Sequence, residues 1–485
     1  MTMYPSYHQN LQAHAVVIGG SMAGLLAARV LSERFERVTI LEKDHFPATA
    51  ENRKGVPQGR HVHGLLAGGF RAMEALFPDL KDELVSAGAA VADVVSDGRW
   101  HQYGHYKARF YSGLEGIAVS RPLLEATVRG RVLALPNVEA VEGARVRGLL
   151  TTADKSRVTG VRFQRSGGSA EALQADLTLD ASGRGSRTPV WLDALGYSRP
   201  AEDEIRIGVG YTSRCYRREP SDLGGDFGAI ITGTPPHERR MGTVLRIDGD
   251  RWHVTLSGFL GDHAPADEAG FLAFARSLPA PDVYGFLKGA DPVSEFATYR
   301  FPSSLRRRYE RLARFPEGVL VTGDALCSFN PIYGQGMSVA ALEALALRDS
   351  LAEQRESLDG LRRRFFHRAA KVVDTPWGLA AGADFAYPEV EGKRPFGTVL
   401  TTRYVARLHA VAAHDEVVCR AFFEVINLLA PPASLFRPRI AFRVLRGSRF
   451  NRRLGFSSVL APPPFNDLGA DVPPRKARLV ARDDS

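Results

Sequence analysis

The chain has 485 residues, of which 44% are hydrophobic and 24% charged. This composition is typical of a globular protein, and the length predicts two or three structural units rather than one core. The net charge of +9 comes from basic residues, mostly arginine, that are spread along the chain, so it does not favour nucleic-acid binding.

The cysteines, the apolar runs and the first ten residues bear on metal binding and on where the protein is found. Cys215, Cys327 and Cys419 are odd in number and widely spaced, which argues against a disulfide framework or a cysteine metal site. The sequence contains no apolar run of membrane-spanning length, and residues 1–10 lack the apolar region of a signal peptide. We therefore expect a cytoplasmic protein without a transmembrane segment.

The first predicted elements form the start of a βαβ unit. A short buried strand over 15–18 leads into a turn of the GxGxxG type, in which Gly19 and Gly24 flank Ser21 at the middle glycine position. Glycine allows the tight turn, and the N-terminus of the following helix can bind a pyrophosphate. A second strand ends at Glu42, 18 residues after Gly24, where an acid typically binds a ribose. This context predicts dinucleotide binding.

The rest of the first unit is predicted from loop and capping signals. Within a loop rich in Gly, Pro, Arg and His, His61 and His63 are candidates for proton transfer, or else loop residues that bond the backbone or a cofactor. Ser120 is a good N-cap for the helix that begins at Arg121. The further predicted elements are a helix near 65–76, a hairpin over 145–164 and a strand over 177–180 that ends in Asp180.

Between about 200 and 302 the pattern changes to strands. Residues 251–257 alternate apolar and polar side chains, as in a sheet with one face on a core or a pocket. The segment therefore predicts a separate, mainly antiparallel sheet that binds the substrate. Four aromatic residues are candidates to line the substrate pocket, with packing in the core as the alternative: Trp252, Phe259, Tyr299 and Phe301.

The chain then returns to the first unit. A hydrophobic strand over 318–322 runs into Asp324, and a Pro/Gly-rich loop precedes an Ala/Leu-rich helix. This is a second cofactor-type segment, far from the first glycine turn. Two such segments favour FAD held along its length over a nicotinamide nucleotide held at one end. The predicted domains are 1–199 and 303–352 for FAD, 200–302 for substrate, and 353–485 as a helical region with a Pro-rich tail.

Near the end of the chain, residues 437–453 contain seven arginines and no acid, with apolar residues between them. Such a segment can dock on an acidic carrier protein or on a membrane surface. The alternative is a solvated helix face that packs beside the core.

Four motifs in a fixed order carry a resemblance to a known family. They are the glycine turn at 19–24, Glu42, the segment 180–187 (Asp-Ala-Ser-Gly-Arg-Gly-Ser-Arg), and Gly323-Asp324 followed by Pro331-x-x-Gly334-x-Gly336. Together they resemble the FAD-dependent monooxygenase superfamily that has the p-hydroxybenzoate hydroxylase fold. Residues 53–63, 183–186 and 329–338 are most similar to actinobacterial polyether epoxidases, such as those of lasalocid and monensin biosynthesis.

The resemblance implies an α/β fold: a Rossmann-like FAD-binding domain, an inserted mainly antiparallel β substrate domain and a helical C-terminal region. It places the residues at 19, 21 and 24 at the FAD pyrophosphate and Glu42 at the adenosine ribose. Arg121 would reach the ribityl or pyrophosphate region, and Asp324 would accept a hydrogen bond from ribityl or ribose hydroxyls. Arg53 resembles an arginine of a mobile loop that covers the flavin.

The resemblance also assigns the loop before the last helix of this domain. Following Pro331, backbone N–H groups would face the flavin pyrimidine edge, where a helix N-terminus stabilises negative charge on the reduced ring. The residues concerned are Gly334, Gln335, Gly336 and Met337. Asp180 and Gly183 resemble an Asp-Gly motif that is interrupted here, which leaves direct contact with NADPH open.

The chemistry implied by the resemblance is oxygen transfer. Reduced flavin and dioxygen form a C4a-hydroperoxide, whose distal oxygen passes to an alkene or an activated ring. The expected substrate is a lipophilic, polyketide- or terpenoid-like intermediate of secondary metabolism. Electrons would come from NAD(P)H, directly or through a flavin reductase. The residues do not identify a catalytic acid or base.

Three alternatives differ in chemistry. A flavin-dependent halogenase is disfavoured because its Trp-x-Trp-x-Ile-Pro signature is absent and the four tryptophans are isolated. A prenyl reductase of the geranylgeranyl reductase type would use the same FAD to reduce a double bond. A non-enzymatic flavin-binding redox protein is the third possibility.

Overall fold

The computed structural model describes residues 12–353 and 357–453. The N-terminal part is built on a five-stranded parallel sheet with the order β17-β11-β1-β2-β7. Most residues of its strands are buried, as expected for a parallel sheet covered on both faces. The strands are β1 (Gln12–Ile18), β2 (Phe35–Leu41), β7 (Val138–Val141), β11 (Leu177–Asp180) and β17 (Val319–Val321).

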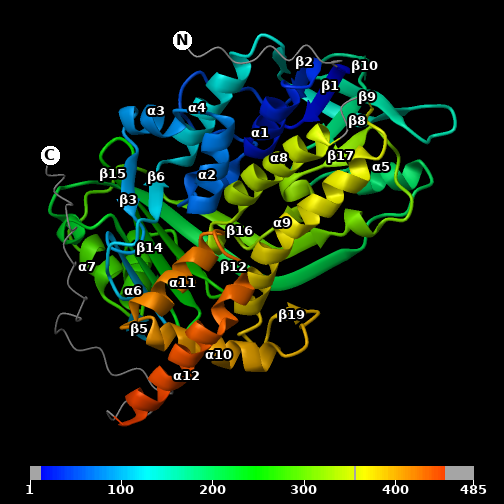
Figure 1. Cartoon of the computed structure of the whole chain (residues 1–485). Coiled ribbons are helices and arrows are strands. Elements are labelled where there is room, and N and C mark those ends of the chain that lie inside the picture. The colour runs from blue at the N-terminus through cyan, green and yellow to red at the C-terminus, as the bar shows by residue number, and fades with distance from the viewer. Residues whose placement is uncertain (1–11, 354–356, 454–485) are drawn as a thin grey trace, which may run out of the picture.

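Helices and a small sheet complete this part. The helices α1, α8 and α9 run alongside one another next to the parallel sheet (Figure 1). A three-stranded antiparallel sheet packs apolar residues such as Phe163 into the same core. The elements are α1 (Met22–Leu31), α2 (Ala67–Leu76), α3 (Leu80–Ser86), α4 (Arg121–Leu133), α5 (Thr188–Ala194), α8 (Gly336–Ala352), α9 (Leu361–Asp384), β8 (Ala144–Thr151), β9 (Val158–Arg165) and β10 (Ala170–Gln174), with β3 (Ala90–Asp93) paired to β6 (Glu115–Ala118).

A second, larger sheet has the order β18-β16-β12-β15-β14-β13-β4-β5, with β19 paired to β12. All neighbours are antiparallel except β13 and β4, so the predicted antiparallel character is confirmed. The strands are β4 (Gly98–Gln102), β5 (His105–Tyr106), β12 (Glu202–Arg217), β13 (Gly228–Thr232), β14 (Arg240–Ile247), β15 (Arg251–Gly258), β16 (Ala297–Arg307), β18 (Cys327–Ser328) and β19 (Glu391–Gly392).

This sheet is not confined to the segment expected from the sequence. β4 and β5 come from residues 98–106, and β18 comes from the return segment. Sequence reasoning missed β4 because its partner in the sheet, β13, lies more than a hundred residues away. It missed β5, which pairs with β4, because β5 has only two residues. The predicted domain boundaries therefore stay a prediction, although strands are present from β12 to β15, where the change of pattern predicts them.

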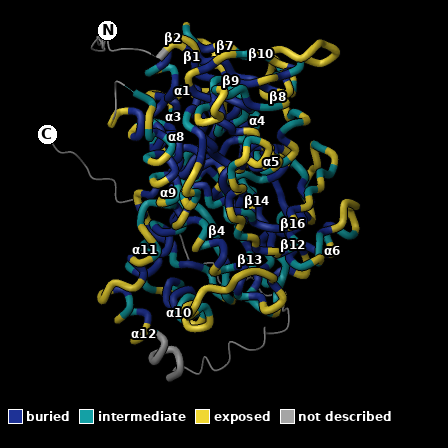
Figure 2. Tube along the Cα trace, turned by 90° about the vertical axis from the view of Figure 1, so that its right-hand side faces the viewer, coloured by how far each residue is buried: buried dark blue, intermediate teal, exposed yellow. Residues whose placement is uncertain are grey.

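Helices cover the large sheet. α6 (Glu268–Arg276) and α7 (Asp282–Leu287) pack against the core that contains Trp252. The C-terminal part is helical, as predicted, with α10 (Thr398–Val411), α11 (Glu416–Ile426) and α12 (Pro438–Arg453); α10 and α12 lie at the lower end of the molecule in Figure 1. Figure 2 shows buried residues running through both sheets. The predicted Pro-rich tail lies outside the described residues.

Within the described ranges, none of the helices is both long and apolar enough to cross a membrane.

Candidate functional site

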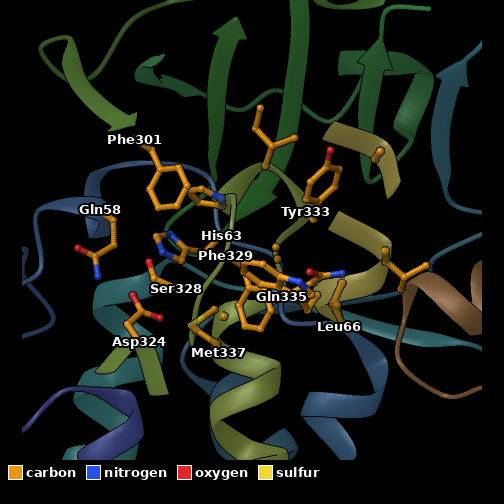
Figure 3. A pocket seen from close by; sticks show the side chains of 18 of the residues that line it. Gln58, His63, Leu66, Phe301, Asp324, Ser328, Phe329, Tyr333, Gln335 and Met337 are labelled. Atoms are coloured by element: carbon orange, nitrogen blue, oxygen red, sulfur yellow. The ribbon is translucent and has the colours of Figure 1, made fainter. Parts of the chain in front are cut away.

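A large cavity lies between the two sheets and the C-terminal helices. Its volume is about 1680 Å³, compared with roughly 300–1,000 Å³ for a typical small-molecule pocket. It therefore has room for a dinucleotide beside a second molecule. Figure 3 shows Asp324 and Met337 near the helices on one side of the cavity and Phe301 toward the large sheet.

The cavity brings together most of the residues predicted to contact a cofactor. Those that line it are Gly19, Ser21, Glu42, Arg53, Arg121, Gly183, Asp324, Pro331, Gly334, Gln335, Gly336 and Met337. Asp180 and Gly24 are not among the lining residues.

Steric hindrance explains why the N-terminal turn has glycine at positions 19 and 24. Gly19 has φ +101°, and a Cβ there would lie 2.7 Å from the carbonyl oxygen of Ala181. A Cβ on Gly24 would overlap the carbonyl oxygen of Gly19, so Gly24 serves close packing of α1 on β1 and not direct contact with a pyrophosphate. The Ser21 hydroxyl donates to Glu125 (2.8 Å) instead of capping α1. The first N–H groups of α1 therefore remain suited to an anion.

A buried network of charges lies beside this turn. The Glu125 carboxylate accepts hydrogen bonds from Arg53 Nε (2.9 Å) and Arg121 Nη2 (2.7 Å), and all three side chains are at most 7% exposed. Burial alone would raise the pKa of Glu125, but the charges of Arg121 and Arg53 outweigh it and lower the pKa to about 2. The network therefore holds Arg121 in place next to Ser21, which it also contacts (2.8 Å).

Glu42 and Arg53 meet at the nucleotide end of the cavity. Glu42 accepts hydrogen bonds from the N–H groups of Gly20 (2.8 Å) and Asp44 (3.0 Å). Arg53 Nη1 lies 3.3 Å from Glu42, and its Nη2 donates to the Gly20 carbonyl (3.2 Å). Three carboxylates, those of Glu42, Asp44 and Glu125, hold Arg53 beside the first turn, and its place in a loop that covers the flavin stays a prediction.

The prediction that Asp180 contacts a cofactor also needs correction. It is fully buried and accepts hydrogen bonds from Ser182 N (2.9 Å), Ser186 Oγ (2.6 Å) and Thr188 Oγ1 (2.5 Å). These bonds engage both carboxylate oxygens of Asp180. Its side chain therefore shapes the loop after β11 and does not line the cavity. Gly183 in that loop does face it, at φ +85° with open space where a Cβ would be.

In the return segment, Asp324 is open to the cavity, although protein surrounds that region on all sides. Burial raises the pKa of its carboxyl group, against the charges of Arg121 and Arg184. Among the described residues, no donor is bonded to this carboxylate. Glu343 on α8 fixes the turn behind it by accepting from Thr322 Oγ1 and Gly323 N, both at 2.6 Å. Asp324 thus offers an oriented acceptor to a ligand.

The N-terminus of α8 closes this part of the cavity. Gln335 precedes the helix without capping it, and its buried Oε1 has no partner in the described part of the chain. Gly334 has φ +64°, and a Cβ there would lie 3.6 Å from the Cα of Gly64. An uncapped helix end, an orphaned amide oxygen and the open Asp324 are the features that a flavin with its ribityl chain can satisfy. The residues present therefore fit FAD.

The aromatic predictions divide between two faces of the large sheet. Phe259, Tyr299 and Phe301 line the cavity. Trp252 does not: it packs against Phe286 (5.8 Å between ring centroids) and donates to Asp222 (2.7 Å). Alternation along β15 puts Trp252 on the face that α6 and α7 cover, so its prediction as a pocket residue is wrong.

His61 lies at the boundary between the two halves of the cavity. Its Nδ1 is 2.7 Å from Ser213 Oγ, and its ring centroid is 5.3 Å from that of Tyr211 and 5.9 Å from that of Tyr299. Burial lowers its pKa to about 4. His63 bonds the His61 carbonyl (2.9 Å), and burial lowers its pKa to about 3. Both rings are therefore neutral at neutral pH.

Sequence reasoning missed three residues of the site. Glu125 carried a local signal, because it lies four residues after Arg121 on one helix. Tyr211 and Glu343 carried none, since they reach the site only through the pairing of β12 and the packing of α8.

Comparison with known proteins finds relatives that cover most of the chain. Protein Rv3254 of Mycobacterium tuberculosis is 36% identical over 444 residues, which cover 87% of this chain and 90% of that protein. Kynurenine 3-monooxygenase of Salinispora arenicola is 26% identical, over 69% of this chain and 72% of the enzyme. No protein-family model matches the chain.

Solved structures share the fold. The flavin-dependent brominase Bmp2 has a TM-score of 0.63 at 13% identity, covering 91% of this chain and 100% of the brominase. The tetrameric form of 2-methyl-3-hydroxypyridine-5-carboxylic acid oxygenase has a TM-score of 0.55 at 19% identity, covering 76% and 90%. The predicted α/β architecture is confirmed, while the narrower resemblance to polyether epoxidases is not shown by these relatives. The chain is similar in sequence to a kynurenine 3-monooxygenase and in fold to flavin-dependent enzymes, and it belongs to the family of Protein Rv3254.

Proposed function

We propose that the protein is an FAD-dependent monooxygenase that transfers one oxygen atom from dioxygen to a lipophilic substrate. The observation that carries this proposal is the shared cavity: the residues that fit FAD and an aromatic chamber on the large sheet line the same space. The resemblance to polyether epoxidases supports epoxidation, or else hydroxylation, of a polyketide- or terpenoid-like intermediate.

The cofactor would lie along one side of this space. Glu42 and the first turn of α1 would hold its nucleotide end, and Asp324 would bind the ribityl chain. The N-terminus of α8 at Gly336 would face the ring and stabilise negative charge on it. When bound, FAD supplies electrons and activates dioxygen, which the side chains themselves cannot do.

The chain's own residues would bind the substrate and exclude water. Phe259, Tyr299 and Phe301 form an apolar wall that orients a hydrophobic molecule and keeps the reacting region dry. His61, neutral and fixed by Ser213, offers a hydrogen bond at the edge of this wall. NAD(P)H would supply the electrons, directly or through a flavin reductase. The protein would act in the cytoplasm.

The test is incubation of the purified protein with FAD, NADPH, a flavin reductase and candidate polyenes under ¹⁸O-labelled dioxygen. We expect one labelled oxygen atom in the organic product. A parallel reaction without protein controls for free reduced flavin. If no organic product carries label, the monooxygenase proposal fails.

Two further arms separate the alternatives. Anaerobic turnover with reduced flavin that saturates a double bond would indicate a prenyl reductase. Addition of bromide should leave the product unchanged, whereas a brominated product would indicate the halogenase branch of the superfamily.

A further inference from the structure

Exposed apolar side chains gather on the C-terminal helices. Among the described residues, six large hydrophobic side chains are exposed at α10, at α12 and just before each helix. Phe396 is fully exposed and Leu400 is 74% exposed. Single exposed apolar residues are normal, but a cluster marks an interaction surface. We call this set the C-terminal face: Phe396, Val399, Leu400, Phe436, Phe442 and Leu445.

The two halves of this face lie side by side. The ring of Tyr404 on α10 stacks on Phe436 (4.7 Å between centroids), and its hydroxyl donates to the Leu435 carbonyl (2.6 Å). On α12, Ile440 and Val444 are buried against the protein. The helix therefore already has an inward apolar stripe, and its exposed residues form a second, outward one. Figure 2 shows exposed residues along α10, at the end of the molecule that also carries α12.

The segments that carry the face are basic. Residues 393–414 and 425–453 contain eleven lysines and arginines and no aspartate or glutamate. Arg443 is paired with Asp415 (2.7 Å), but several other basic side chains are exposed and have no carboxylate partner in the described part of the chain. These are Lys393, Arg403, Arg407, Arg437, Arg439 and Arg446.

Part of the face lies at the rim of the cavity. Phe396 and Phe436 belong to the exposed set and at the same time line the cavity. A molecule that enters between them would pass from the outward apolar surface to the aromatic wall of the large sheet.

We propose that the C-terminal face docks on an anionic lipid bilayer, from which the lipophilic substrate enters the cavity. Exposed Phe and Leu side chains can insert at the boundary of headgroups and acyl chains, while the surrounding arginines bind anionic headgroups. An acidic carrier protein would use the arginines but not six exposed apolar side chains. This inference extends the proposed function to the source of the substrate, and docking itself does not depend on the reaction.

The test is flotation of the full chain with vesicles of phosphatidylcholine alone or mixed with phosphatidylglycerol. We expect binding to the mixed vesicles that weakens in high salt. Replacing both Leu400 and Phe442 with serine should weaken binding at least about tenfold. Each replacement removes the apolar area that the side chain would bury in the bilayer. Replacing Arg439 and Arg446 with glutamine should weaken it about fivefold for each arginine.

Matched controls keep the result interpretable. Val190 and Val293 are exposed apolar residues outside the face, and their replacement by serine should leave vesicle binding unchanged. FAD content confirms that each variant is folded. Absence of vesicle binding, or binding that the face variants do not change, would overturn the inference. So would binding to an acidic carrier protein without binding to vesicles. Docking without oxygen transfer would leave it standing while the proposed function fails.

Discussion

The two ends of the cavity are lined by different kinds of side chain, charged at one end and aromatic at the other. At the nucleotide end, Arg53, Arg121 and Glu125 are buried charges that satisfy one another. At the sheet end, aromatic rings such as Phe259 and Phe301 provide area without charge. A buried ion network is stable only with every partner in place, whereas an apolar wall tolerates different shapes. Under the proposed function, the nucleotide end would select one cofactor and the sheet end would accept a class of substrates.

The largest effect should come from breaking the charged end. Glu125→Ala leaves Arg53 and Arg121 buried without their shared partner, and we expect a loss of about 3–5 kcal/mol in unfolding free energy. Urea unfolding followed by fluorescence measures it. Glu125→Gln retains acceptor oxygen and should lose less. A Glu125→Ala protein as stable as the wild type would mean that the network is not a structural unit.

The glycine turn offers a steric test at the same end. Gly24→Ala places a methyl group on the Gly19 carbonyl oxygen and should cost about 3 kcal/mol, through overpacking. Gly130 is its matched control, because it lies in α4 with open space around it. Gly130→Ala should stabilise by up to about 1 kcal/mol. Equal effects in the two variants would contradict the packing role of Gly24.

These residues also show what sequence can predict. The glycine turn, Glu42 and Asp324 follow from local spacing, because a strand-turn-helix fixes where its own residues point. Glu343 could not be predicted, since only the packing of α8 brings it to the turn at Gly323. Trp252 was misplaced because alternation shows that β15 has two faces but not which one meets the cavity.

Asp324 probes the cofactor contact itself. Asp324→Ala should weaken FAD binding by about 1–3 kcal/mol, because a buried ribityl hydroxyl loses its acceptor. Equilibrium titration of the apoprotein measures this loss. Asp193→Ala, at an exposed ion pair with Arg199, is the control and should leave FAD affinity unchanged. Unchanged affinity in Asp324→Ala would remove the assigned role.

The smallest effects should appear as opposite pH dependences of two buried groups, Glu343 and His61. Burial raises the pKa of Glu343 from 4.5 to about 7, so its contribution to stability falls as pH rises through that interval. Burial lowers the pKa of His61 from 6.5 to about 4, so its contribution falls as pH decreases through that interval.

Unfolding free energies between pH 4 and 8 measure both effects. Glu343→Gln should remove part of the loss toward pH 7, and His61→Gln should remove part of the loss toward pH 4. Variants with the same pH slope as the wild type would show that folding does not shift the pKa of either group.

The central claim is that one FAD molecule spans the cavity from Glu42 to the N-terminus of α8. Calorimetric titration of the apoprotein with FAD and with FMN tests it most directly, because FMN lacks the adenosine half. We predict one FAD per chain, bound at least about tenfold more tightly than FMN, which corresponds to about 1.4 kcal/mol from the nucleotide end. Absence of FAD binding, or equal affinity for FAD and FMN, would contradict the account.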